Sequence, residues 1–500
     1  MTVAPEHTYA TLIIGAGFTG LGTAIRLADA GIEDIAILER ADRVGGTWRD
    51  TTYPGASCDV PSLLYSYSFV KNPTWSRTYS PAPEICRHLD DMATRFDIRR
   101  HIRFNHEVSE LTFDEDAGVW TAKTKNRKRF RARTVVLASG PLSDVRFPDI
   151  RGLDSYKGHK IHSARWDHDY DFTDKRVAVI GTATSAIQII PELVKRAGFV
   201  KVFQRTPGWV LPRLDIATPS AVQTLFAKVP AVQQLARRAL FWGHEASATA
   251  LVWDTPLTSL VARLGQAHLR AQVKDPWLRR QLTPDFAPGC KRMLVSSDYY
   301  PALQRDNCKL IDWPIATLSP VGIRTSDGVE HHLDCIVFAT GYDVHLTGPP
   351  FGVRGLGGRS LAAEWAGGAQ AYKSINAHGY PKLFFMTGPN LGPGHNSLLV
   401  YIEGQLDYAV RGIRTILDDD LRYLDVREDV QQRHNADIQR RLTKTTWMSG
   451  CRSWYLTKDG FNGSMYPGFA TQYLRQMSDF RHADYQAVAH RASSRVTSTA

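Results

Sequence analysis

The chain has 500 residues, of which 43% are hydrophobic and 22% charged, and its formal net charge is +11 at pH 7. This composition is ordinary for a globular protein and excludes a mainly disordered or collagen-like chain. No apolar run approaches the ~20 residues of a membrane-spanning helix, so we predict no membrane span. The short segment before the first apolar run leaves no room for a signal peptide, and we expect a cytoplasmic protein.

Cysteines and basic residues point to neither a metal nor a nucleic-acid site. No cysteine pair has CxxC spacing, so we expect reduced thiols, no redox disulfide, and no zinc or other metal site. The six cysteines are Cys58, Cys86, Cys290, Cys308, Cys335 and Cys451. Lysine and arginine are dispersed except around Asn126–Arg129, which we predict to be a solvated hairpin. We therefore expect the positive charge to attract anionic cofactors rather than nucleic acid.

A glycine-rich turn follows the first apolar run of the chain. Gly15, Gly17 and Gly20 have the GxGxxG spacing of a strand-to-helix turn that binds a dinucleotide. The first glycine permits the tight turn, the second lets the backbone approach the pyrophosphate, and the third lets the helix pack on the strand. Glu39 ends the next apolar run, where a carboxylate accepts hydrogen bonds from ribose hydroxyls. This unit predicts a site for FAD or NAD.

A second turn of this kind follows the apolar run at 177–180. It begins at Gly181 but has Ala183 in place of the middle glycine, and the methyl group narrows the approach of a pyrophosphate. Arg205 stands at the distance from the first glycine that the acid has in the first unit. Because a guanidinium at this place can bind a 2′-phosphate, we predict that the second unit binds NADP.

Beyond the second turn, apolar residues recur at helical spacing over residues 214–285, which predicts a helical insertion. Strand-like runs and one long helix follow at 309–311, 334–341, 383–386 and 397–417. Together these elements predict an α/β fold with two Rossmann-like dinucleotide-binding domains, for FAD and NADP, and a helical insertion. The predicted division is an FAD-binding domain at 1–147 and 381–490, a connector and NADP-binding domain at 148–212 and 290–380, the helical insertion at 213–289, and a disordered tail at 491–500.

The connector before the second turn has a distinctive spacing, Tyr156-x-Gly158-x-x-x-His162-x-x-x-Trp166-Asp167. A lone histidine or tryptophan is most often structural, but the combined pattern resembles the signature of the type I Baeyer–Villiger monooxygenases. That family usually has phenylalanine at the first position, so the tyrosine keeps the ring and adds a hydroxyl. The related flavin-containing monooxygenases share the two turns but lack the Trp-Asp ending.

Further motifs extend the resemblance from about residue 9 to residue 470. They are Gly46-x-Trp48-x₄-Tyr53-Pro54-Gly55-x₃-Asp59, Gln204-Arg205-Thr206-Pro207, Cys290-Lys291-Arg292 leading to Asp298-Tyr299-Tyr300 and Asn307, Ala339-Thr340-Gly341-Tyr342 and Trp454-Tyr455. The resemblance implies an FAD- and NADPH-dependent monooxygenase that uses O₂. Its substrate would be a small-molecule ketone, converted to an ester or lactone through a flavin peroxide.

The resemblance also implies roles for individual residues. The residues expected to bind FAD are Gly15, Gly17, Gly20, Glu39, Gly46, Thr47, Trp48, Asp59 and Asn396. Those expected to bind NADPH are Gly181, Thr182, Ser185, Arg205, Thr206 and Lys291. The residues expected at a hinge between the domains are Tyr156, Gly158, His162, Trp166 and Asp167. Trp454 is expected to contact NADP or the substrate, and Arg292 and Asp59 are expected to be catalytic.

Physical chemistry supports the expected role of Arg292 independently. The attack of a peroxide anion on a ketone gives an adduct with a negative oxygen, and a fixed guanidinium stabilises it without losing its own proton. A desolvated arginine needs a carboxylate partner, which Asp59 would supply. Without the family motif, a surface charge and a turn residue would be the simpler interpretations of these two residues.

A glycine- and proline-rich loop, residues 388–396, precedes the predicted long helix. A helix N-terminus beneath the flavin ring would stabilise the negative charge of the reduced ring, whereas the alternative is a plain loop with a helix cap. Asn396 is expected to contact the cofactor. His395 has two interpretations at this point, a side chain that faces the flavin or a local cap.

Two alternatives to ketone oxygenation stay open. The same flavin peroxide in protonated form oxygenates sulfur or nitrogen, for example in a sulfide, and needs no Arg292. An NADPH oxidase, or a flavin-binding protein without turnover, is the other, because Ala183 could weaken NADPH binding. A disulfide reductase is disfavoured, since no cysteine pair follows the first helix. Neither the particular ketone nor the oligomeric state can be inferred from the sequence.

Overall fold

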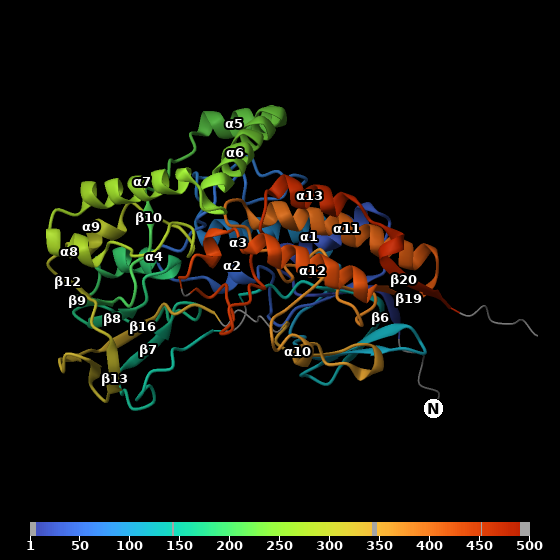
Figure 1. The fold of residues 1–500 in the computed structure, drawn as a ribbon, viewed down its shortest axis with the longest axis horizontal. Helices are drawn as coiled ribbons and strands as arrows, with labels where there is room; N and C mark the ends of the chain where they lie inside the picture. Colours follow the sequence, from blue (N-terminus) through green and yellow to red (C-terminus); the bar gives the residue numbers. More distant parts are fainter. Residues whose placement is uncertain (1–6, 143–144, 343–347, 452, 491–500) are drawn as a thin grey trace, which may run out of the picture.

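The computed structural model describes residues 7–142, 145–342, 348–451 and 453–490, and it contains two main sheets that lie toward opposite ends of the molecule (Figure 1). The first sheet consists, in spatial order, of β17 (Gly352–Arg354), β4 (Val108–Asp114), β5 (Val119–Thr124), β6 (Arg129–Leu137), β1 (Thr8–Ile14), β2 (Ile35–Leu38) and β3 (Ile102–Arg103), with β18 (Leu383–Phe385) also on β6. β1 is parallel to β2 and β6, whereas β4, β5 and β6 are antiparallel neighbours.

The central strands of this sheet are apolar on both sides, so both faces are covered, one of them by helices. Ile13 of β1 points into a core formed with α1 (Phe18–Asp29), α3 (Ala82–Arg95), α11 (Leu398–Asp418) and α13 (Ala470–Ser478). Its neighbours Leu12 and Ile14 point to the opposite face, as alternation along a strand requires, and pack with Trp120 in a second core. The central strand is thus buried on both faces.

The second sheet is parallel throughout, which is typical of a βαβ arrangement with both faces covered. Its spatial order is β12 (Cys308–Ile311), β9 (Phe199–Phe203), β8 (Arg176–Ile180), β16 (Cys335–Phe338) and β7 (His159–His162). Helices α4 (Thr184–Leu193) and α9 (Tyr299–Leu303) contact each other beside it, and the small antiparallel sheet contains β13 (Ile315–Ser319), β14 (Gly322–Thr325) and β15 (Glu330–His332). The α/β fold with two nucleotide-binding units is therefore confirmed.

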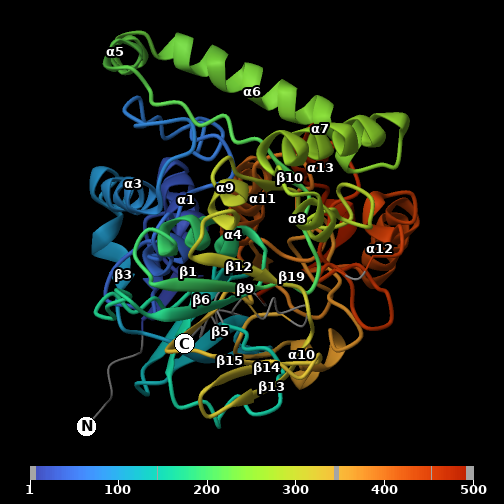
Figure 2. The ribbon, with the colours of Figure 1, turned by 90° about the vertical axis from the view of Figure 1, so that its left-hand side faces the viewer.

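Four helices lie between the strands β10 (Val210–Leu211) and β11 (Leu294–Val295), which pair with each other. They are α5 (Ser220–Lys228), α6 (Pro230–Leu251), α7 (Pro256–Gln272) and α8 (Pro276–Gln281). Proline opens three of them, and the side chains of Thr255 and Asp275 cap α7 and α8. In Figure 2, α6 runs along the top of the molecule, above α7. The predicted domain bounds stay a prediction.

The remaining elements are short or follow the long helix. They are α2 (Thr47–Asp50), η1 (Ile98–His101), η2 (Leu356–Gly358), α10 (Leu361–Glu364), β19 (Leu421–Val426), α12 (Glu428–Leu442), η3 (Thr446–Met448), η4 (His482–Asp484) and β20 (Tyr485–Ala489). The hairpin predicted around Asn126–Arg129 is confirmed, because β5 and β6 pair there in antiparallel register. The tail at 491–500 lies outside the described residues.

One expectation about the cysteines is wrong. Cys290 and Cys451 form a disulfide, with their Cα atoms 6.2 Å apart. The pair was missed because CxxC spacing detects only neighbouring cysteines, whereas these two are 161 residues apart in sequence. The other four cysteines are free. No helix among the residues the structure describes is long and apolar enough to cross a membrane.

Candidate active site

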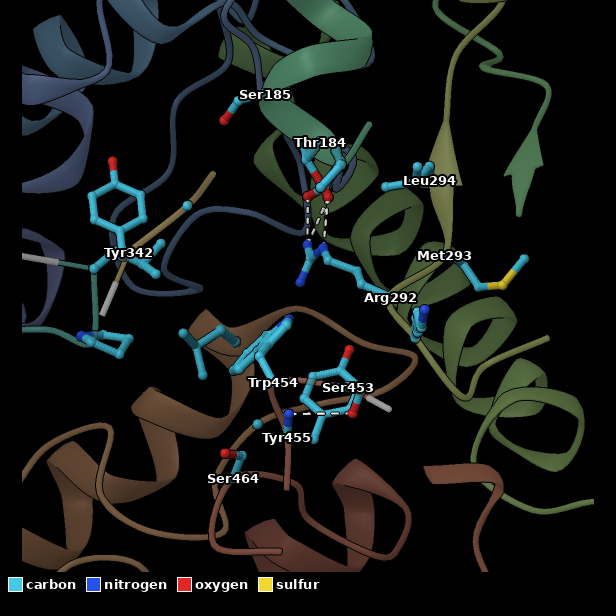
Figure 3. A pocket seen from close by; sticks show the side chains of 18 of the residues that line it. Thr184, Ser185, Arg292, Met293, Leu294, Tyr342, Ser453, Trp454, Tyr455 and Ser464 are labelled. Atoms are coloured by element: carbon cyan, nitrogen blue, oxygen red, sulfur yellow. Dashed lines mark hydrogen bonds and ion pairs between the residues drawn. The ribbon is translucent and has the colours of Figure 1, made fainter. Parts of the chain in front are cut away.

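One large cavity lies where the two nucleotide-binding units meet. Its volume is about 1930 Å³, and it is lined by the second turn, by Thr47 and Trp48 beside the first turn, by the loop at 388–396 and by α6. A pocket for a single drug-sized ligand measures about 300–1,000 Å³. Figure 3 shows Arg292 inside this cavity, with Thr184 and Ser185 of α4 on one side and Trp454 and Tyr455 on the other. The cavity therefore has room for more than one ligand.

The first turn has the backbone that a dinucleotide needs. Gly15 has φ +107°, and a Cβ atom there would lie 2.6 Å from the carbonyl oxygen of Ala138. A Cβ on Gly20 would overlap the carbonyl oxygen of Gly15, so the helix can pack this closely only on glycine. α1 begins after Gly17 with no side-chain cap, which leaves its first N–H groups free for an anion. These features fit the pyrophosphate of FAD.

Glu39 lies at the end of β2 and is 4% exposed. Its carboxylate accepts hydrogen bonds from the backbone N–H of Ala16 (2.8 Å) and of Ala41 (2.9 Å) and from Nη1 of Arg49 (2.9 Å). Arg49 also binds the carboxylate of Asp50 through Nε and Nη2. Sequence reasoning found the acid but missed this arginine, which fixes it.

The second turn forms although it lacks the middle glycine. Gly181 has φ +117°, and a Cβ atom there would lie 2.5 Å from the carbonyl oxygen of Ala339. Ala183 precedes α4 in an extended conformation, with no side-chain cap on the helix. Thr182 donates a hydrogen bond from Oγ1 to the carbonyl oxygen of Thr206 (3.1 Å) and thereby ties the turn to the loop after β9. Because the helix has no side-chain cap, the first N–H groups of α4 are free, and they fit a second pyrophosphate.

Two cations converge beside this second turn. Arg205 is exposed, and Lys291 reaches over the ring of Phe286 with its Nζ 4.5 Å from the centroid. Burial and the neighbouring charge of Arg205 lower the pKa of Lys291. Because both side chains line the same cavity, an anionic group placed between them would relieve their repulsion. The pair fits the 2′-phosphate of NADPH.

Arg292 and Asp59 form a bidentate ion pair inside the cavity. Nη2 of Arg292 lies 2.7 and 2.8 Å from the two carboxylate oxygens, and Nε lies 3.0 Å from Oδ2. The negative charge of Asp59 raises the pKa of Arg292, so the guanidinium keeps its charge at any working pH. The Arg292 side chain is 50% exposed and that of Asp59 only 16%. Both oxygens of the Asp59 carboxylate thus accept hydrogen bonds from Arg292, while the Arg292 side chain stays half exposed in the cavity.

The loop that carries Asp59 is attached to the second unit. The hydroxyl of Tyr53 donates to Oε1 of Gln188 (2.9 Å), and Nε2 of Gln188 donates to the carbonyl oxygen of Ser57 (3.0 Å). Gly55 packs against the backbone of α4, where a Cβ atom would lie 2.6 Å from the carbonyl oxygen of Gln188. Gln188 was missed by sequence reasoning because only the folded chain brings α4 to this loop.

The signature residues of the connector lie outside the cavity. The hydroxyl of Tyr156 donates to the carbonyl oxygen of Leu333 (3.1 Å), and a Cβ on Gly158 would overlap that hydroxyl. Trp166 stacks on Phe172 with ring centroids 5.7 Å apart. These contacts hold the connector onto the second unit rather than shape a ligand site.

His162 and Asp167 complete this segment. His162 ends β7, is 3% exposed and accepts a hydrogen bond at Nδ1 from the backbone N–H of Ala164 (3.1 Å). Burial lowers its pKa, so the ring is neutral near pH 7. Asp167 lies 2.9 Å from Nε2 of His159. A neutral, buried histidine away from the cavity fits a positioning role better than acid–base chemistry.

The loop before α11 is held by a residue of the insertion. Glu245 of α6 accepts from Nε2 of His395 (3.2 Å) and Nδ2 of Asn396 (3.3 Å), and from the backbone N–H of Thr471 (2.8 Å). Although burial opposes ionisation, the hydrogen bonds from His395 and Thr471 lower the pKa of Glu245 to about 2. The His395 ring is therefore oriented by Glu245. The helix α11 is capped by Ser397, whose side chain accepts a hydrogen bond from the backbone N–H of Leu399.

The remaining predicted FAD contacts come from a single short segment. Gly46 has φ +52° and packs against the first turn, where a Cβ atom would lie 3.1 Å from Cα of Gly17. Thr47 and Trp48 line the cavity, and the indole N–H of Trp48 donates to the hydroxyl of Tyr65 (3.1 Å). This segment thus brings the glycine turn and the cavity wall together.

Comparisons with known proteins agree with this geometry. Residues 12–218 match the model of the pyridine nucleotide-disulphide oxidoreductase family. A Baeyer–Villiger monooxygenase of Streptomyces coelicolor is 42% identical over 95% of this chain and 92% of its own length, and one of Pseudomonas aeruginosa is 39% identical over 95% and 90%.

Solved structures give the same result. A steroid monooxygenase bound to NADP is 30% identical with a TM-score of 0.85, and cyclohexanone monooxygenase from Rhodococcus sp. Phi1 bound to NADP⁺ is 26% identical with a TM-score of 0.86. Each match covers 97% of this chain and all of the solved chain. The chain belongs to the Baeyer–Villiger monooxygenases and is an FAD- and NADPH-dependent flavoprotein monooxygenase.

Proposed function

We propose that this monooxygenase oxygenates a small-molecule ketone beside its carbonyl group, and that Arg292, aligned by Asp59, is the residue on which the reaction depends. The observation that supports this proposal is the bidentate pair, which leaves the Arg292 side chain 50% exposed in the cavity beside the second nucleotide turn. The cytoplasmic location stays a prediction.

The two cofactors would occupy the two turns. FAD would lie on the first turn, with its ribose at Glu39, and NADPH on the second turn, with its 2′-phosphate between Arg205 and Lys291. When bound, NADPH supplies hydride to the flavin, and the reduced flavin supplies the electrons that activate O₂. Asn396 and the start of α11 would then approach the flavin ring, and Trp454 would cover the nicotinamide or the ketone.

Arg292 would stabilise negative charge on oxygen while the ketone carbonyl is attacked. A guanidinium remains protonated throughout, so its positive charge is present both for the anionic nucleophile and for the negative oxygen that develops in the adduct. Its geometry is fixed before the reaction because Asp59 holds Nε and Nη2, and preorganised charge of this kind typically contributes about 3–4 kcal/mol to lowering a barrier. Asp59 would act as a positioning residue and keep its own charge.

The variant Arg292→Ala tests this role. We expect it to bind FAD and to be reduced by NADPH like the unmodified protein, but to form ester at least about 100-fold more slowly. The matched control is Arg324→Ala, because Arg324 is 52% exposed and also pairs with a carboxylate, that of Glu330 at 2.9 Å, but does not line the cavity. Ester formation at the normal rate by Arg292→Ala would contradict the proposal.

A sulfide assayed beside the ketone separates the two kinds of oxygenation. Oxygen transfer to sulfur uses a protonated peroxide and needs no fixed anion stabiliser, so sulfoxide formation should survive in Arg292→Ala. Equal loss of both products would point to a defect before oxygen transfer, which the rate of flavin reduction by NADPH measures directly.

A further inference from the structure

We propose that Cys290 and Cys451 form a thiol–disulfide exchange site that accepts small dithiols, and that its oxidised form holds the loop carrying Trp454 and Tyr455 against Arg292. The thiol chemistry stands independently of the catalytic role of Arg292. The predicted effect on turnover rests on the function proposed above.

The disulfide joins two segments that both line the cavity. Cys290 directly precedes Lys291 and Arg292, and Cys451 lies just before Trp454 and Tyr455. Figure 3 shows Arg292 on one side of the cavity and the two aromatic residues facing it from another segment. The disulfide therefore connects the segment that carries Arg292 to the segment of the cavity wall that carries Trp454 and Tyr455.

Hydrogen bonds anchor the start of the loop at 446–456, which carries Trp454 and Tyr455, but not the described residues of its middle. The backbone N–H and Oγ1 of Thr446 donate to the carbonyl oxygens of Val252 (2.9 Å) and Leu251 (2.8 Å) at the end of α6. In the described part of 449–456, the hydrogen bonds join residues of the loop itself, such as Tyr455 N–H to Ser453 Oγ. Among these described residues, the disulfide is thus the bond that joins the loop to its surroundings.

The aromatic residues beyond the disulfide depend on it for their position. Tyr455 is 4% exposed and lies in the electrostatic environment of Arg292, whose charge acts against the rise in its pKa caused by burial. Trp454 is 52% exposed and packs against the Tyr455 ring with centroids 4.5 Å apart. When the disulfide opens, only packing retains these rings at the cavity.

The exchange reaction is balanced in both directions. In reduction, a thiolate of the dithiol attacks Sγ of Cys451, breaks the S–S bond and expels Cys290 as a thiolate, which takes up a proton. The second thiol of the reductant then displaces Cys451 and leaves a cyclic disulfide. In oxidation, the two thiols lose two electrons and two protons to hydrogen peroxide, which becomes two molecules of water. Attack at Cys451 is favoured because Cys451 is partly exposed, whereas Cys290 is 0% exposed.

The other cysteines are poor competitors in these reactions. Burial raises the pKa of Cys308 and of Cys335 to about 12 and raises those of Cys58 and Cys86. Because the thiolate is the reactive form, these thiols react slowly near neutral pH. A change caused by mild oxidation or reduction can therefore be assigned to the pair.

The experiment uses the FAD-loaded protein, purified in air without reductant, and a sample treated with dithiothreitol and then freed of it. Titration of thiols after denaturation should find four in the first sample and six in the second. Chymotrypsin should cleave after Trp454 or Tyr455 at least about tenfold faster in the reduced sample, because local opening governs cleavage. Hydrogen peroxide should restore both original values.

Turnover is measured separately. The ratio of ester formed to NADPH consumed should fall about tenfold after reduction and in Cys451→Ser, since displacing groups that line a reacting centre has effects of this size or larger. Cys308→Ser, which does not line the cavity, is the matched control and should behave like the unmodified protein. Cys290→Ser gives a second test of the pair.

Six titratable thiols in the untreated sample would overturn the proposal, as would equal cleavage of both samples. Both measurements need no substrate, so they fail independently of the role proposed for Arg292. If the thiol counts agree but the coupling ratio does not change, the proposed effect of the loop on turnover is wrong.

Discussion

The assignment of FAD to the first turn and NADPH to the second can be tested with one substitution in each. Gly15 and Gly181 have nearly the same geometry, with φ of +107° and +117°. An added Cβ would lie 2.6 Å from the carbonyl oxygen of Ala138 at Gly15 and 2.5 Å from that of Ala339 at Gly181. Alanine at either position therefore strains the backbone and overlaps the residue that directly follows the neighbouring strand, β6 or β16.

The expected magnitude follows from these two effects. A residue in a disfavoured backbone region costs about 1–3 kcal/mol, and an overpacked contact costs a further 1–3 kcal/mol or so. A loss of even about 2 kcal/mol from the bound geometry weakens binding roughly 30-fold. We expect Gly15→Ala to lose FAD, and Gly181→Ala to keep FAD but bind NADPH at least about 30-fold more weakly.

The assay measures FAD content by absorbance after gel filtration and NADPH affinity by the rate of flavin reduction. Gly352→Ala is the matched control, since no atom lies within 4 Å of its added Cβ and its φ is not positive. If Gly181→Ala lost FAD while Gly15→Ala lost only NADPH affinity, the assignment of the turns would be reversed. Unchanged binding in both would refute the steric reasoning itself.

Three further predictions concern charges. Arg205→Ala and Lys291→Ala should each raise the KM for NADPH about 10- to 100-fold with little effect on that for NADH, because a charge-assisted hydrogen bond is worth about 1.5–3 kcal/mol; equal effects on both coenzymes would contradict a 2′-phosphate site. The pKa of Glu245 is lowered from 4.5 to about 2, so its contribution to stability is complete above pH 4.5 and is lost as the pH falls toward 2. The unfolding free energy of Glu245→Gln, measured by denaturation, should lack this pH dependence. Burial lowers the pKa of Lys382 from 10.5 to about 7, so between these pH values the unfolded chain binds one more proton than the folded chain. The free energy of unfolding should therefore rise from pH 7 to 10.5. Urea unfolding of Lys382→Met should show no such rise.

The sequence predicted the parts of this molecule that depend on local chemistry. Gly15 and Gly181 could be identified because a tight turn between a buried strand and a helix leaves few alternatives to glycine. Glu39 and Arg205 followed from their distance along the chain. Asp59 and Arg292 were identified as candidates by the family motif, and the structure pairs them. Their catalytic roles stay a prediction.

The parts that could not be predicted are partners distant in sequence. Arg49, Gln188 and Glu245 carry no local pattern, and each acquires its place only when another segment folds against it. The same reason explains the error about Cys290 and Cys451, because pairing over so long a separation depends on where two loops end in space. Three-dimensional proximity, not composition, decides these contacts.

The attachment of residues 53–59 to Gln188 has a consequence for how the enzyme moves through its cycle. Asp59 lies in sequence within the predicted FAD-binding domain, yet its loop is hydrogen-bonded to α4 of the second unit. If the second unit rotates to bring the nicotinamide toward the flavin and then withdraw it, the acid that aims Arg292 travels with that rotation. Hydride delivery and the orientation of the guanidinium would then be mechanically coupled, so that the displacement that ends flavin reduction also positions Arg292 for oxygen transfer.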